Sequence, residues 1–274
     1  MSEGLAGSFF EPDDDGADRW RATTATAGPW SRALQHGGPP AALLVRASER
    51  AAAEGTGRDD LQPLRVAVDF LGAVPVGVVQ TSVEVVRAGR SAVLVDAELS
   101  APTSSGGEQR VVLRSRTWLL RTAAEPTPVP VPAVATDLPG PDGLADDDRW
   151  DFGYARHLRW RPASGDPHGP GPAAVWVSPA VPLVPGEPLG GLQRVITVAD
   201  SASGVSAELA WDRWSFANVD VTVHLSRQPV GEWVLMDART RLEPTGNGVA
   251  EAVLHDRGGP LGRSAQTLVV GPLP

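Results

Sequence analysis

The stretch Val68–Leu99 reads VDFLGAVPVGVVQTSVEVVRAGRSAVLVDAEL and is rich in β-branched residues. The turn Arg87-Ala88-Gly89-Arg90-Ser91 divides it into two apolar segments, as a hairpin would. Strands are therefore predicted at Leu64–Leu71, Val78–Val86, Ala92–Leu99 and Arg110–Leu120. Ahead of them, Pro40–Ala53 places Leu and Ala at helical spacing and predicts an amphipathic helix. The simplest packing for this order is one helix wrapped by a curved antiparallel sheet, an α+β fold.

A second copy of this pattern follows farther along the chain. Three landmarks recur in the same order at a nearly constant spacing of about 150 residues. They are Gly37-Gly38 with Gly190-Gly191, Pro75-Val76-Gly77 with Pro229-Val230-Gly231, and Arg114-Ser115 with Arg263-Ser264. The second copy has a predicted helix from Leu189 to about Ser203 and strands at Ser215–Leu225, Glu232–Leu242, Gly248–His255 and Ala265–Val270.

The two copies are separated by a segment crowded with proline and acidic residues. Residues 123–148 read AAEPTPVPVPAVATDLPGPDGLADDD and have no helical period, which favours an extended linker. We therefore expect an N-terminal domain over residues 1–122, a linker over 123–148 and a C-terminal domain over 149–274.

The composition excludes several classes of function. The chain has 274 residues, a formal net charge of -9, no Cys and no Lys. The acidic balance argues against nucleic-acid binding, and the absence of Cys rules out a disulfide or a thiolate nucleophile. No signal-like N-terminus and no apolar run of membrane-spanning length is found, so a cytoplasmic protein without a membrane partner is expected. The five His residues lack metal-ligand spacing, and no metal or other cofactor is predicted.

These residues resemble the double-hot-dog acyl-CoA thioesterases of the TesB-like type over most of the chain, excluding the linker. In the first half the resemblance rests on Gly37-Gly38 and on the run from Val68 to Leu99, whose turn resembles the family's R-x-G-x-S hairpin. In the second half it rests on VADSASG, ANVDVTVHLSRQPVGEW and SAQTLVV. The resemblance implies a tandem hot-dog fold, an acyl-CoA substrate and thioester hydrolysis, with a homo-oligomer as a possible assembly.

The resemblance also implies a catalytic set of an Asp on the second helix, a Thr or Ser on the next strand and a Gln on the last strand. By motif these positions fall on Asp200, Asn218 and Gln266, with Asn in place of the hydroxyl residue. The repeat places Asp200 opposite about Ala47, so only one copy keeps a carboxylate at this helix position. A buried Asp without a partner is costly, which favours a chemical role for this copy. Asp200 would orient or deprotonate the attacking water, and Gln266 and Asn218 would fix that water from other sides.

Substrate contacts are predicted at the helix starts and beside the hairpins. The helix start at Gly190-Gly191 can offer backbone N–H groups to an oxyanion, and the start at Gly37-Gly38 can serve instead. Arg87, Arg90 and Arg227 are the residues predicted to hold the coenzyme A phosphates.

Two other functions remain open. A hot-dog enoyl-CoA hydratase or dehydratase pairs an Asp with a His a few residues on in one helix, and Asp200 has no such neighbour. A non-catalytic acyl-CoA-binding protein is compatible with Asn218, which stands where the family has a Thr or Ser. No G-x-S-x-G, G-x-G-x-x-G or P-loop pattern is present, which argues against a serine hydrolase, a dinucleotide enzyme and an NTPase.

Overall fold

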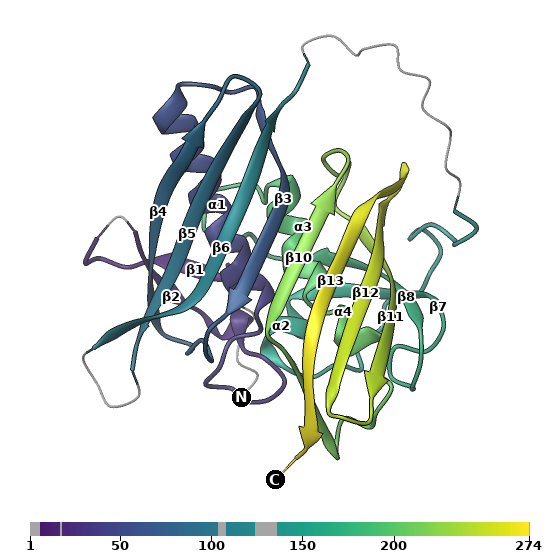
Figure 1. Cartoon of the computed structure of the whole chain (residues 1–274). Coiled ribbons are helices and arrows are strands. Elements are labelled where there is room, and N and C mark those ends of the chain that lie inside the picture. Colours follow the sequence, from purple (N-terminus) through teal and green to yellow (C-terminus); the bar gives the residue numbers. More distant parts are fainter. Residues whose placement is uncertain (1–5, 17, 104–107, 124–135, 274) are drawn as a thin grey trace.

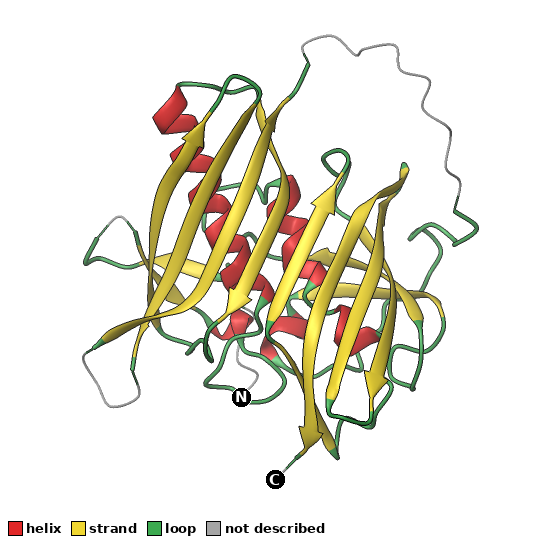
Figure 2. Cartoon of the chain, in the orientation of Figure 1, coloured by secondary structure: helices red, strands yellow, loops and turns green. Residues whose placement is uncertain are grey.

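The computed structural model describes residues 6–16, 18–103, 108–123 and 136–273, and within them one continuous antiparallel sheet lies over the helices (Figure 2). The strands of the first half are β1 (Phe10–Pro12), β2 (Arg19–Ala22), β3 (Leu61–Phe70), β4 (Val78–Ala88), β5 (Ala92–Pro102) and β6 (Gln109–Arg121). Those of the second half are β7 (Leu158–Ser164), β8 (Ala173–Pro179), β9 (Trp214–Asn218), β10 (Asp220–Leu225), β11 (Val234–Glu243), β12 (Asn247–Asp256) and β13 (Gly259–Pro272).

The sheet order has the symmetry that a duplication predicts. From its centre outward, one side runs β3-β6-β5-β4-β2-β1 and the other runs β10-β13-β12-β11-β8-β7, with β9 extending the pairing along β13. The two halves meet where β3 and β10 pair antiparallel, for example Ala67 against Thr222. Figure 1 shows this seam at the centre of the molecule. Each half thereby covers the inner edge of the other, which would otherwise be left unpaired.

The helices are α1 (Gly38–Thr56), α2 (Gly153–Arg156), α3 (Gly191–Ala199) and α4 (Ala202–Val205), with a short 3-10 turn at Thr24–Thr26. The long helices α1 and α3 pack against each other beneath the sheet (Figure 1). In β5, buried and half-buried residues alternate, and the buried set faces the helix layer: Val93, Val95, Ala97, Leu99 and Ala101. This period of two is what places one face of a strand in the core.

Helix α1 runs antiparallel to α3, and this arrangement decides where the site forms. Gly38 at the start of α1 lies so close to the end of α3 that a Cβ there would sit 2.3 Å from Thr197 O. Farther along α1, Arg46 forms a paired ion contact with Glu187, just ahead of α3, at 2.6 and 2.7 Å. The start of α1 therefore meets the end of α3.

The predicted elements are largely confirmed, with two corrections in the second half. The helix predicted from Leu189 to about Ser203 ends at Ala199, and the short helix α4 follows it. The strand predicted at Ser215–Leu225 is divided at Val219 into β9 and β10. Val219 accepts a hydrogen bond from Phe70 N–H and donates one to Thr267 O, so the chain shifts there between partner strands. Strands β1, β2, β7 and β8 were not predicted.

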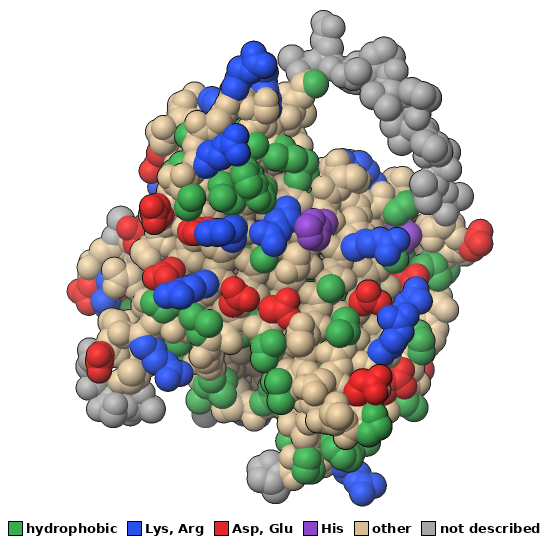
Figure 3. All heavy atoms as spheres, viewed as in Figure 1, with side chains coloured by type: hydrophobic (Ala, Val, Ile, Leu, Met, Phe, Trp, Pro, Cys, Tyr) green, Lys and Arg blue, Asp and Glu red, His purple; other side chains and the backbone are tan. Residues whose placement is uncertain are grey.

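The outer face of the sheet carries mixed charges (Figure 3). Neighbouring strands pair Arg114 with Glu98 at 2.8 Å and Arg116 with Asp96 at 2.6 Å across exposed positions. Residues 124–135 of the predicted linker lie outside the described residues. Its later part packs on the second half, where Trp176 Nε1 donates to Pro139 O and Leu138 and Leu144 contact a small core beside β8 and β11. The domain boundaries remain predictions.

None of the described helices combines the length and the apolar character needed to cross a membrane.

Candidate active site

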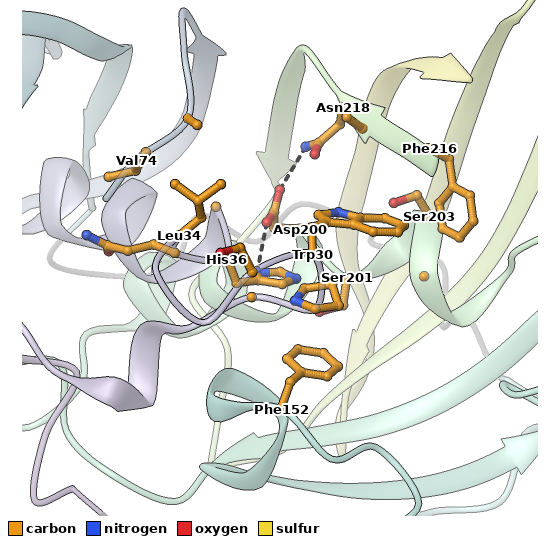
Figure 4. Close-up of a pocket in the computed structure, with 18 of the residues that line it drawn as sticks. Trp30, Leu34, His36, Val74, Phe152, Asp200, Ser201, Ser203, Phe216 and Asn218 are labelled. Atoms are coloured by element: carbon orange, nitrogen blue, oxygen red, sulfur yellow. Dashed lines mark hydrogen bonds and ion pairs between the residues drawn. The ribbon is translucent and has the colours of Figure 1, made fainter. Parts of the chain in front are cut away.

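A cavity of about 620 Å³ opens where the start of α1, the end of α3 and strand β9 come together. Its polar wall includes His36, Asp200, Ser201, Ser203 and Asn218. The rest of the wall is mainly aromatic, with Trp30, Phe70, Trp150, Phe152, Trp160, Trp211 and Phe216. A mostly apolar cavity with a few converging polar groups is the usual form of a small-molecule site. Figure 4 shows Asp200 between Asn218 and His36 in this wall.

Asp200 is the residue on which the other polar groups converge. It caps the C-terminal end of α3, and its side chain is only 3% exposed. Asn218 Nδ2 donates to Oδ1 at 2.8 Å, and Gln266 Nε2 lies 3.3 Å from the same oxygen. His36 Nδ1 lies 3.0 Å from Oδ2. The carboxylate therefore accepts hydrogen bonds from Asn218 and Gln266 and lies within ion-pair distance of His36, contacts that offset the cost of burying it.

Gln266 lies behind Asp200 and outside the cavity wall. Its Nε2 also donates to Asp200 O at 2.9 Å, and its Oε1 accepts Ser203 N–H at 3.1 Å. Both ends of the amide thus hold the turn between α3 and α4. The structure brings Gln266 to the carboxylate, where it supports Asp200, and it gives Gln266 no exposed atom for holding water because the residue is 1% exposed.

Asn218 stands at the end of β9 with its amide turned toward Asp200. It lines the cavity, and its Nδ2 also lies 3.3 Å from Asp220 O. An amide NH₂ group can donate to a carboxylate, so this contact survives the replacement of a hydroxyl residue by Asn. The neighbouring Asp220 accepts a hydrogen bond from Thr267 N–H at 2.7 Å, so its carboxylate is engaged at the break between β9 and β10.

His36 joins the site from the first half of the chain. Its ring stacks on Tyr154 with 3.8 Å between centroids and 4° between planes. Tyr154 is fully buried, and its hydroxyl donates to Thr197 O at 2.6 Å and contacts Ser201 Oγ at 2.9 Å. Burial raises the pKa of Tyr154, so the phenol stays neutral and serves as a fixed platform for the imidazole.

The start of α1 supplies a backbone N–H beside the carboxylate. A Cβ at Gly37 would lie 2.9 Å from Asp200 Oδ2, so only glycine fits there. Pro39 and Pro40 have no N–H group, and Ala41 N–H donates to Gly37 O. Within α1, Gly38 N–H is therefore the donor of the first turn that has no intrahelical acceptor. Gly38 N lies 3.2 Å from His36 Nδ1. When Nδ1 carries its proton and donates to Asp200, it cannot accept Gly38 N–H, which then becomes available to a ligand.

The other predicted helix start lies elsewhere. Gly190-Gly191 open α3 at the end opposite Asp200, about 13 Å along the helix axis. There Gln193 donates to Glu49 of α1 and also caps Gly190 N–H at 3.2 Å. The duplicated counterpart of the site is therefore closed by side-chain contacts, and the structure does not bring Gly190 and Gly191 to Asp200.

The predicted phosphate-binding arginines are also outside the cavity wall. Arg90 lines a shallow surface hollow with Gly55 and Thr56 at the far end of α1, and Arg87 is exposed on the same hairpin. A helix of 19 residues is about 28 Å long, so this hairpin is far from Asp200. Arg227 is engaged by the buried Asp256 at 2.7 Å through Nη2. No described contact joins these three arginines to the site.

Sequence reasoning missed the aromatic wall contributed by the first half. Trp30 stacks on Trp211 with 5.3 Å between centroids, and both contact Phe216 edge-on. In the second half, Trp211 lines the cavity, whereas Trp176 and Trp233 pack in the small core beside β8 and β11. The sequence feature that could have pointed to a contribution from the first half was His36, which directly precedes Gly37-Gly38.

The described residues contain no group of three or more His, Cys, Asp or Glu side chains able to hold a metal ion.

Comparisons with known proteins agree with this architecture. Residues 26–120 match the model of an acyl-CoA thioesterase N-terminal domain, and residues 132–270 match that of an acyl-CoA thioesterase C-terminal domain. A comparison with curated protein sequences gave no match.

Three solved structures illustrate the likeness of fold. A conserved protein of unknown function with a hot dog fold from Alicyclobacillus acidocaldarius is 17% identical with a TM-score of 0.69, covering 96% of this chain and 95% of that one. A putative thioesterase from Novosphingobium aromaticivorans is 23% identical, with a TM-score of 0.69 and coverage of 96% and 99%. The acyl-CoA thioesterase II TesB2 from Mycobacterium marinum is 16% identical, with a TM-score of 0.62 and coverage of 95% and 94%. The chain therefore belongs to the acyl-CoA thioesterase family, as a thioester hydrolase built from two hot-dog domains in tandem.

Proposed function

We propose that the protein hydrolyses an acyl-CoA thioester to the free acid and coenzyme A at the cavity beside Asp200. The observation that carries this proposal is the convergence of Asn218, Gln266 and His36 on one buried carboxylate in the cavity wall. Water attacks the thioester carbonyl carbon directly, and no Ser or Cys intermediate forms. Asp200 organises the groups that activate this water, and Gly38 N–H stabilises the developing oxyanion.

The helix dipole supports this assignment of the oxyanion site. The start of α1 carries partial positive charge, and its Gly38 N–H, which lies 3.2 Å from His36 Nδ1, has no intrahelical acceptor. The aromatic wall supplies the apolar surface for the acyl group. The head-group contacts of coenzyme A remain a prediction at Arg87, Arg90 and Arg227, and the position of these arginines outside the cavity wall weakens it.

The test is release of free thiol from octanoyl-CoA by the purified protein. Asp200→Asn keeps the shape of the side chain but removes the carboxylate, and we expect kcat/KM to fall about 10²–10⁴-fold. Glu49→Gln is the matched control, because Glu49 is the nearest carboxylate on the paired helix and lies outside the cavity wall; we expect near wild-type activity. An Asp200→Asn enzyme as active as the wild type would refute the site.

A second candidate reaction deserves measurement because of one contact. A hot-dog hydratase pairs its Asp with a His. Asp200 has no His neighbour on its own helix, but His36 of the other half lies 3.0 Å from its carboxylate. This pair favours an enoyl-CoA hydratase as the alternative. Loss of the enoyl absorbance of a 2-enoyl-CoA, without thiol release, would identify that reaction. Acyl-CoA binding without either reaction would identify a binding protein.

A further inference from the structure

We infer that His36 is the general base of the reaction: its Nε2 takes the proton from the attacking water, while Asp200 acts by orienting the ring. The inference rests on the proposed function and assigns a catalytic residue to that same site. It starts from how the oxygens of Asp200 are used. Oδ1 receives Asn218 and Gln266, and Oδ2 faces His36 Nδ1.

The exposure of the two side chains decides which of them meets water. Both side chains line the cavity, but Asp200 is 3% exposed and has contacts at both oxygens, whereas His36 is 13% exposed. In Figure 4 the imidazole lies beside the carboxylate in the cavity wall. A water bound there reaches the imidazole more readily than it reaches the carboxylate.

The orientation of the ring leaves the reactive nitrogen free. Nδ1 points at Asp200, and stacking on the immobilised Tyr154 prevents the ring from tilting away. Among the described residues Nε2 has no hydrogen-bond partner. Donation of Nδ1–H to the carboxylate fixes the tautomer with its lone pair on Nε2, as in carboxylate–imidazole pairs of other hydrolases.

The reaction then balances without another reagent. As the water oxygen bonds to the thioester carbon, its proton passes to Nε2 and the carbonyl π pair moves onto oxygen beside Gly38 N–H. Collapse of the tetrahedral intermediate breaks the C–S bond, and the departing sulfur receives the proton from Nε2. The products are the acid and the thiol, and His36 returns to its neutral form. Asp200 stabilises the imidazolium between the two steps.

Three titratable groups surround this chemistry. Asp200 from the end of α3 and Tyr154 from α2 contact the ring, and His168 lies elsewhere in the cavity wall, paired with Asp147 at 2.9 Å. Burial raises the pKa of Tyr154, so it does not ionise in the range of an assay. If His36 is the base, the loss of kcat/KM in acid depends on this ring, and His36→Gln, which keeps Asp200, tests that dependence.

The experiment compares pH profiles of kcat/KM for wild type, His36→Gln and His224→Gln, the last on the exposed outer face of β10. We expect the kcat/KM of His36→Gln to be about 10²–10⁴-fold lower than that of the wild type and no longer to fall in acid. Added imidazole should restore part of the activity. His224→Gln should keep the wild-type profile. A His36→Gln enzyme whose kcat/KM still falls in acid, or remains within tenfold of wild type, overturns the inference.

A second measurement protects the test against misfolding. Melting temperatures of the variants are recorded first, and the wild-type profile is informative by itself. A wild-type rate that stays flat as the pH falls through the acid range excludes His36 as the base. A wild type that hydrolyses no thioester instead refutes the proposed function, so the two failures are distinguishable.

Discussion

At the scale of single residues, two carboxylates of the paired helices differ in their surroundings, Asp200 at the end of α3 and Glu49 within α1. Asp200 is surrounded by donors and faces the cavity. Glu49 is partly buried beside Gln193, and desolvation raises its pKa from 4.5 to about 7, opposed by the Gln193 hydrogen bond and by Arg46. The first is suited to orienting a reacting group, and the second is suited to joining the helices.

The raised pKa of Glu49 predicts how stability depends on pH. Between pH 4.5 and about 7 the folded protein binds this proton more tightly than the unfolded chain. The contribution is therefore complete below pH 4.5 and is lost as the pH rises through about 7. We expect the free energy of unfolding to fall by about 1–3 kcal/mol across this window from Glu49 alone.

Glu49→Gln removes this titration and keeps an acceptor for Gln193. Urea unfolding at pH 5 and pH 8 measures the effect. We expect the free energy of unfolding of the variant, relative to that of the wild type, to be higher at pH 8 than at pH 5. If the difference between the two proteins is the same at both pH values, Glu49 does not titrate in this range.

At the scale of elements, the contact between α1 and α3 depends on a glycine. A Cβ at Gly38 would lie 2.3 Å from Thr197 O, which is backbone and cannot move alone. Gly38→Ala is therefore expected to force the helices apart, lower the melting temperature by several degrees and reduce kcat/KM, because the same turn carries His36 and the proposed oxyanion donor.

Another glycine of the same helix provides the control. A Cβ at Gly55 would have Val85 Cγ2 as its nearest neighbour at 3.6 Å, an ordinary contact. Gly55→Ala is expected to stabilise the protein by up to about 1 kcal/mol through helix propensity and to leave activity unchanged. Thermal unfolding and thiol release on both variants test the pair. Equal effects of the two substitutions would contradict the helix-contact argument.

The elements that the sequence predicted well are those with a periodic pattern. The alternation in β5 and the apolar face of α1 were sufficient for prediction because each is local. The break at Val219 and the end of α3 at Asp200 were not predictable, since both depend on partners from distant strands, Phe70 for the first and Gln266 for the second.

The site divides in the same way. Asp200, Asn218 and Gln266 were placed through motifs of the second half, and the structure brings all three together. His36 belongs to the first half, and its approach to Asp200 follows from the antiparallel pairing of α1 with α3, which no local pattern encodes. The arginines were chosen for their hairpins, yet the length of α1 separates Arg90 from the cavity.

At the scale of the whole molecule, the halves share one sheet, and residues of both halves line the candidate active site. β3 and β10 form the central pair, and the site combines His36 with Asp200 across that junction. Residues 1–123 and 136–274, co-expressed as separate chains, are therefore expected to form a 1:1 complex with thioesterase activity, whereas either piece alone is expected to be inactive. Copurification and thiol release measure this. An active C-terminal piece alone would show that His36 and the start of α1 are dispensable.

The closure of the counterpart site by Glu49 and Gln193 has a consequence for stoichiometry. In a symmetric homodimer every substitution occurs twice, so two identical clefts must keep or lose a feature together. Fusion into one polypeptide removes that constraint, and here one position holds Asp200 in a cavity wall while at its counterpart Gln193 donates to Glu49 between the helices. A non-hydrolysable acyl-CoA analogue should consequently saturate the protein in calorimetry at one equivalent per chain.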